Sequence, residues 1–93
     1  LFTHPAMLAH EPPPGHAERV ERLQSVLDAL EGLALDRREA PLAPREAIER
    51  VHPANYVDAL EPAFTEARAT RVRLDPDTYI SAGSREAIYR AAG

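Results

Sequence analysis

The sequence predicts a mostly α-helical chain with long loops, and three observations support this. Apolar residues recur at helical spacing from residue 20 to residue 30, and a second helical pattern runs to residue 92. Residues 4–16 hold four prolines and one glycine, which excludes the interior of a helix there. Helices joined by extended connections therefore account for most of the chain.

Composition narrows the classes of protein. The chain has 93 residues, of which 44% are hydrophobic, but its nine prolines and five aromatic side chains predict a thin core. It has no cysteine, which excludes disulfides and thiolate zinc sites and favours a cytoplasmic location. No apolar run approaches the ~20 residues that cross a bilayer, so no membrane partner is expected. The net charge of −4, with both signs interspersed, argues against a nucleic-acid partner.

Both ends resemble cut edges of a larger domain. Residues 1–3 read as the tail of a strand, and no initiator methionine precedes them. Residues 91–93 lie within a helical pattern that is still running, where a native domain more often has a cap or a polar tail. We therefore expect residues 1–93 to be the N-terminal part of one domain.

The first helix is the most strongly patterned element. Gly32 stands where a left-handed glycine would end this helix. Its apolar stripe consists of Val20, Leu23, Val26, Leu27 and Leu30.

A short second helix is expected to open at Pro44 and to end before Pro53. Another helix begins near Tyr56 and is stopped or kinked at Pro62, with its continuation over residues 63–70 left open.

Residues 71–74 alternate polar and apolar side chains, which predicts a short extended piece leading into the turn at residues 75–78. The last helix follows, and either Ser81 or Ser84 is expected to cap it.

Two short segments place several polar groups beside a helix and predict a binding site. They are residues 15–23 (GHAERVERL) and residues 74–81 (LDPDTYIS). Loops that a rigid scaffold holds in this way commonly bind ligands. His4, His10 and His16 are spaced six apart across the proline-rich loop, which is not a spacing typical of zinc ligands, so no metal site is expected from this chain.

Three segments, in order, resemble the histone deacetylase-like amidohydrolases. Leu8-Ala9-His10, the Pro-Gly turn and HAERVERL together are similar to that family's first loop and first helix, where HPERPERL follows a glycine. VHPANYV is similar to its VH-x-x-x-Y-V segment. The end, LDPDTYISAGSREAIYRAAG, is similar to its D-x-D-T-Y-x-S-x-x-S-x-x-A-x-x-A-A-G stretch. The resemblance covers nearly the whole chain and is strongest to the bacterial class II-like branch of acetoin-utilisation and acetylpolyamine proteins.

The resemblance implies a complete domain with the α/β, three-layer arginase/deacetylase-like fold and a mostly parallel sheet. It also implies a zinc hydrolase that removes acetyl groups from acetylated lysine, an acetylated polyamine or a related amide by means of a metal-bound water. The family's zinc ligands, paired histidines and oxyanion-stabilising tyrosine would all lie beyond residue 93. The 93 residues would then carry no catalytic group, and a homo-oligomer stays open.

The resemblance assigns Asp77 to the binding of substrate backbone amides, with Asp75 as its competitor. A carboxylate suits this role because it accepts charge-assisted hydrogen bonds. From the residues alone, Asp77 would merely cap the turn at residues 75–78.

The resemblance places Arg22 in an internal acetate channel as a buried residue, since a guanidinium binds a carboxylate through two hydrogen bonds. From the residues alone, Arg22 would be a surface arginine paired with Glu18. His16 is assigned to the mouth of the substrate tunnel, and a histidine bonded only to backbone is an equal alternative. Ala17 and Val20 replace the family's two prolines here, which should loosen the loop.

The alternative function is a small helical protein-interaction module, or an inactive deacetylase fragment. It follows from the same thin core, because the apolar stripe of the first helix would stay partly exposed if nothing else packed on it.

Overall fold

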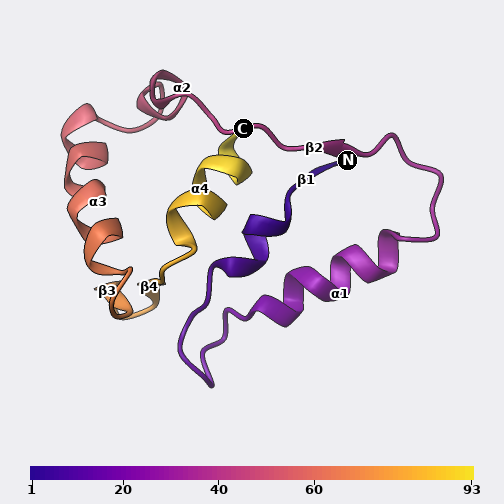
Figure 1. Cartoon of the computed structure of the whole chain (residues 1–93), viewed down its shortest axis with the longest axis horizontal. Coiled ribbons are helices and arrows are strands. Elements are labelled where there is room, and N and C mark those ends of the chain that lie inside the picture. The colour runs from indigo at the N-terminus through magenta and orange to yellow at the C-terminus, as the bar shows by residue number, and fades with distance from the viewer.

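The computed structural model describes residues 1–93 and is dominated by helices with long connections between them, as predicted (Figure 1). The elements in chain order are β1 (Phe2–Thr3), the 3₁₀ helix η1 (Pro5–Ala9), α1 (Val20–Leu30), β2 (Arg38–Glu39), α2 (Arg45–Glu49), α3 (Ala54–Glu66), β3 (Val72–Asp75), β4 (Thr78–Ile80) and α4 (Ser84–Ala92).

The prediction of α1 is confirmed, but the prediction of how it ends is wrong. The stripe of α1 is at most half-buried, because only η1 makes extensive contact with this helix. Gly32 is not left-handed; the only positive φ in the chain is the 82° of Gly15. The Arg37 guanidinium instead donates to the carbonyl oxygens of Leu30, Glu31 and Leu33, and so satisfies the end of the helix that a left-handed glycine would otherwise close.

Helix α2 has Pro44 as its N-terminal cap residue, as expected, and α3 continues through Pro62 to Glu66. Proline lacks an N–H and so removes one helical hydrogen bond. The ladder resumes after it, since the Ala67 N–H bonds the Ala63 carbonyl at 2.9 Å.

The core is small and lies between α3, the β3–β4 hairpin and α4. Nine of the 93 residues are buried, which confirms the expected thin core. Its central cluster consists of Phe64, Ala67, Ile80 and Tyr89. Most other apolar side chains remain partly or largely exposed to solvent.

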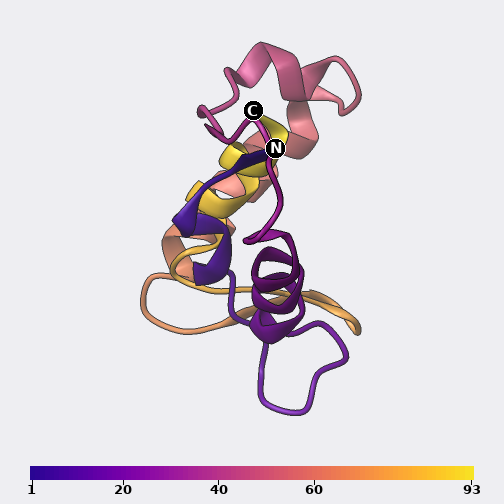
Figure 2. The ribbon, with the colours of Figure 1, turned by 90° about the vertical axis from the view of Figure 1, so that its right-hand side faces the viewer.

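Two short sheets complete the structure. β3 and β4 form an antiparallel hairpin in which Val72 faces Ile80, which confirms the extended piece predicted over residues 71–74. β1 confirms the strand expected at residues 1–3 and pairs in parallel with β2, a strand that the sequence did not predict. A two-residue strand has no periodicity to detect. The 3₁₀ helix η1, which lies between β1 and β2 in the sequence, packs against both α4 and α1 (Figure 1 and Figure 2).

A polar cluster joins α3 to α4 beside the core. The Glu61 carboxylate accepts hydrogen bonds from the Arg85 guanidinium at 3.0 and 3.2 Å and from the Tyr89 hydroxyl at 3.1 Å. The Arg85 guanidinium also lies 4.7 Å from the centroid of the Tyr89 ring. The hydrogen bonds from Arg85, and then that from Tyr89, lower the pKa of Glu61 against the opposing effect of burial.

We expect Glu61→Gln to reduce the free energy of unfolding by about 0.5–1 kcal/mol at pH 7, a modest figure because solvent screens the pair. The ionised carboxylate is favoured in the folded state, so its contribution is present above the ordinary pKa of 4.5 and is lost as the pH falls through the lowered value. Urea denaturation at pH 7 and below pH 4.5 measures this. Glu86→Gln, which removes a pair within α4 only, is the control. An equal loss at every pH would contradict the assignment.

Candidate functional site

The two segments predicted to form a binding site meet in one cavity. It has a volume of about 270 Å³ and lies between the loop that joins η1 to α1 and the β3–β4 hairpin. Its lining residues are His10, Pro12, His16, Glu18, Asp77, Thr78 and Tyr79. Polar side chains dominate this lining, so the cavity suits a ligand with hydrogen-bonding groups.

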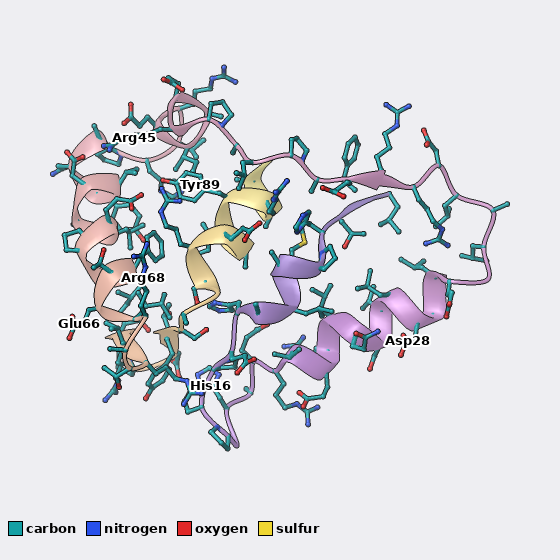
Figure 3. The ribbon with its side chains drawn as sticks, in the orientation of Figure 1. His16, Asp28, Arg45, Glu66, Arg68 and Tyr89 are labelled. Carbon is teal, nitrogen blue, oxygen red and sulfur yellow. The ribbon has the colours of Figure 1, made fainter.

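His16 links the loop to the hairpin (Figure 3). Its ring meets the Tyr79 ring edge to face, with the centroids 5.6 Å apart and the planes at 80°. Its Nδ1 accepts a hydrogen bond from the Glu18 N–H at 3.1 Å. The neutral ring therefore carries its proton on Nε2. His16 is thus bonded to backbone and also lines the cavity, and its contact with a substrate stays a prediction.

The two aspartates of the hairpin turn have different roles. The Asp75 carboxylate accepts the Asp77 N–H at 2.9 Å. This bond, followed by the hydrogen bond from the Thr78 side chain, lowers the pKa of Asp75. The interpretation of Asp77 as the residue that caps the turn is therefore wrong, because Asp75 does this. The Asp77 carboxylate has no hydrogen-bond or ion-pair partner and lines the cavity.

Arg22 lies outside this cavity, and the expectation of its burial is wrong for these 93 residues. Its side chain is 62% exposed and pairs with Glu18 one turn earlier, with 3.6 Å between guanidinium nitrogen and carboxylate oxygen. The cause is that nothing in residues 1–93 covers this face of α1. The role of Arg22 in an acetate channel stays a prediction.

Two serines fasten the loop after η1 to the start of α4. The Ser84 hydroxyl lies 2.7 Å from His10 Nδ1 and accepts the Ser81 N–H at 2.7 Å. The Ser81 hydroxyl accepts the Glu11 N–H at 2.9 Å and donates to the Ala9 carbonyl oxygen at 3.2 Å. Neither serine caps α4, contrary to the prediction. Gly83 is the N-terminal cap residue, and no side chain caps the helix, because the two serine hydroxyls make the bonds described above instead.

Gly83→Ala is expected to destabilise this junction. A β-carbon at position 83 would overlap the Ala9 carbonyl oxygen and the Ala9 β-carbon, so the loop and the helix would have to separate. We expect the free energy of unfolding, measured by urea denaturation, to fall by about 1–3 kcal/mol. Gly32→Ala, where a β-carbon meets nothing within 4 Å, is the control and should have little effect. Equal effects of the two changes would contradict the close packing.

The cavity residues do not form a metal centre. No group of three or more His, Cys, Asp or Glu side chains is arranged to hold a metal ion. His4 is engaged elsewhere, since its Nδ1 accepts the Ala6 N–H and its Nε2 lies 3.4 Å from Glu39. None of the helices is both long and apolar enough to span a bilayer.

Sequence reasoning missed His10 as a cavity residue. Its contact with Ser84 joins positions 74 residues apart, and no local pattern indicates such a pairing. The signals in the sequence were its place at the start of the proline-rich segment, next to the predicted binding loop, and its inclusion in the first segment that resembles the family.

Comparison with known proteins agrees with the resemblance seen in the sequence. A family model described as the histone deacetylase domain matches residues 16–93. The matched range includes His16, Arg22 and Asp77, whereas His10 lies outside it. No curated protein matches the chain.

Proposed function

Because the chain belongs to the histone deacetylase domain family, we propose that it is the N-terminal segment of a zinc-dependent deacetylase catalytic domain. The reaction is hydrolysis of the acetyl amide of an acetylated lysine, acetylated polyamine or related amine. The observation that carries this proposal is the family match over residues 16–93. It favours an enzyme over a small interaction module.

In this proposal residues outside the chain would hold the zinc ion, since the side chains of residues 1–93 do not fit a metal site. When bound, zinc supplies an activated water and polarises the acetyl carbonyl. The task of residues 1–93 is to bind and orient the substrate.

Asp77 is the proposed substrate-binding carboxylate. Asp75 is already committed to the turn, whereas the Asp77 carboxylate has no partner and lines the cavity. An ionised carboxylate accepts strong hydrogen bonds from amide N–H groups. His16 and Tyr79 form the neighbouring wall and would contact the substrate at the mouth of its tunnel.

Arg22 is proposed for the acetate channel. Its guanidinium is held only by Glu18 at 3.6 Å, so it keeps donors for a second carboxylate. This role requires the remainder of the domain to cover the exposed face of α1.

The proposed complete fold is α/β and arginase-like, and the protein would be a cytoplasmic enzyme of the bacterial class II-like branch. The parallel pairing of β1 and β2, with η1 and α1 between them in sequence, supports this fold. Parallel neighbours need a long crossover that usually contains a helix, which is the unit from which α/β sheets are built.

Hydrolysis of an acetyl-lysine reporter tests the proposed function. We expect the full-length protein to deacetylate it after zinc loading, to lose activity with a chelator and to regain it with zinc. The 93-residue chain alone is expected to be inactive. Absence of activity in the folded, zinc-loaded full-length protein, on both acetyl-lysine and acetylated polyamine, would overturn the proposal.

A further inference from the structure

His10 forms a wall between two cavities of different character. On one side its ring lines the polar cavity with His16 and Asp77. On the other side it lines an apolar groove with Met7, Leu23 and Ala87. The ring is half-buried and belongs to the loop that Ser81 and Ser84 fasten to α4. Its position is therefore fixed through the bond to Ser84 and through the loop.

Ser84 determines which nitrogen of His10 carries the proton. The Ser84 side chain is fully buried, and its hydroxyl oxygen already accepts the Ser81 N–H at 2.7 Å. Its one proton has two candidate acceptors, namely His10 Nδ1 at 2.7 Å and the Ser81 hydroxyl at 3.3 Å. We take Ser84 as the donor to Nδ1, because this places its proton in the shorter of the two contacts. The neutral His10 ring then carries its own proton on Nε2.

The Nε2 atom of His10 is free to bind a ligand. It has no hydrogen-bond partner in the structure, and no buried side-chain nitrogen or oxygen lacks a partner, so Nε2 is accessible. The same reasoning applies to Nε2 of His16, whose Nδ1 is held by the Glu18 N–H. The residues that line the cavity therefore include two histidines whose Nε2 atoms are accessible and Asp77, whose carboxylate has no partner.

We propose that His10, positioned by Ser84, binds the substrate beside Asp77 by donating its Nε2–H to a carbonyl oxygen, so that the cavity selects an amide-bearing substrate. This inference rests on the proposed function. A secondary amide offers both partners that the cavity needs, an N–H for Asp77 and a carbonyl oxygen for His10. The ammonium groups of an acetylated polyamine have donors only and would leave the histidine donor unpaired. The preferred substrate is therefore acetyl-lysine within a peptide.

Two His10 variants of the full-length protein and two substrates test this proposal. With an acetyl-lysine peptide, His10→Leu should raise KM on the order of threefold to tenfold and change kcat little, the effect of losing one neutral hydrogen bond. His10→Gln places an amide N–H near the position of Nε2 and should restore part of the affinity. With an N-acetylated diamine, which has no second amide, the increase in KM caused by His10→Leu should be smaller than with the peptide.

Each outcome of this comparison decides between the proposals. Equal effects of His10→Leu on the two substrates, or a wild type that cleaves the diamine but not the peptide, would overturn the His10 inference and leave the proposed function standing. A wild type that cleaves neither substrate would overturn the proposed function, and substrate recognition by His10 with it.

The tautomer of His10 gives a readout that does not depend on activity. Ring ¹⁵N chemical shifts of the full-length protein should show the Nε2–H form in the wild type and a mixture of tautomers in Ser84→Ala. The His16 ring provides the internal control, because its Nδ1 is held by backbone and should not respond. An Nδ1–H form of His10 in the wild type would overturn the positioning by Ser84. If Ser84→Ala does not fold, the wild-type spectrum still decides this.

Discussion

Asp77→Ala in the full-length protein is expected to lower kcat/KM for an acetyl-lysine peptide by about 30- to 1,000-fold. This corresponds to the loss of one or two charge-assisted hydrogen bonds, on the order of 2–4 kcal/mol. The fold should survive, because the Asp77 side chain makes no contact within the chain that holds the turn together; that contact uses its backbone N–H. Steady-state kinetics measure the effect, and circular dichroism verifies that the variant is folded.

Asp75→Asn is the matched control for this change. The asparagine side chain keeps an oxygen that can accept the Asp77 N–H, so the turn is retained while the charge is removed. We expect kcat/KM to change less than about threefold, within the range of one weak hydrogen bond. If Asp75→Asn were the damaging substitution and Asp77→Ala the neutral one, the two roles would have to be exchanged.

Local patterns in the sequence predicted the local elements well. The apolar stripe located α1, the alternation at residues 71–74 located β3, and Pro44 located the start of α2. These signals succeed because helical and extended periodicity follow directly from backbone geometry. The meeting of the two polar segments in one cavity was also predicted, since both stand beside a helix in short, constrained loops.

The failures share a physical cause, which is dependence on partners distant in sequence. The end of α1 is satisfied by Arg37 and not by Gly32, and the hydroxyl of Ser84 bonds His10 and not the end of its own helix. β2 exists only because β1 pairs with it. Propensity cannot reveal such contacts, because tertiary packing decides them.

The site residues show the same difference between what local patterns predict and what only the three-dimensional structure reveals. The assignment of the turn to Asp75, which leaves Asp77 free, needed the geometry of the hairpin, because both are aspartates within three residues of each other. By contrast, the exposed Arg22 and its pairing with Glu18 were predictable from the residues alone, because positions i and i+4 are neighbours on a helix.

Ile80→Ala is expected to reduce the free energy of unfolding by about 2–5 kcal/mol, the usual cost of truncating a buried isoleucine. Ile80 is 1% exposed and packs with Phe64, Ala67 and Tyr89, so a cavity would open at the centre of the core. Only nine of the 93 residues are buried, and few neighbours remain to compensate for the loss. Urea denaturation measures the change.

The same substitution connects the core to the candidate site. Along β4, side chains alternate, so Ile80 enters the core while its neighbour Tyr79 meets the ring of His16. The loss of core contacts in Ile80→Ala is therefore expected to make the hairpin that carries Asp77 less rigid. For this reason kcat/KM should fall even at temperatures where the variant stays folded. Ile80→Val, which removes one methyl group, should cost only about 0.5–1.5 kcal/mol and leave kcat/KM close to the wild-type value. Equal decreases in the free energy of unfolding for Ile80→Ala and Ile80→Val would contradict the idea that core packing of Ile80 holds the hairpin in place.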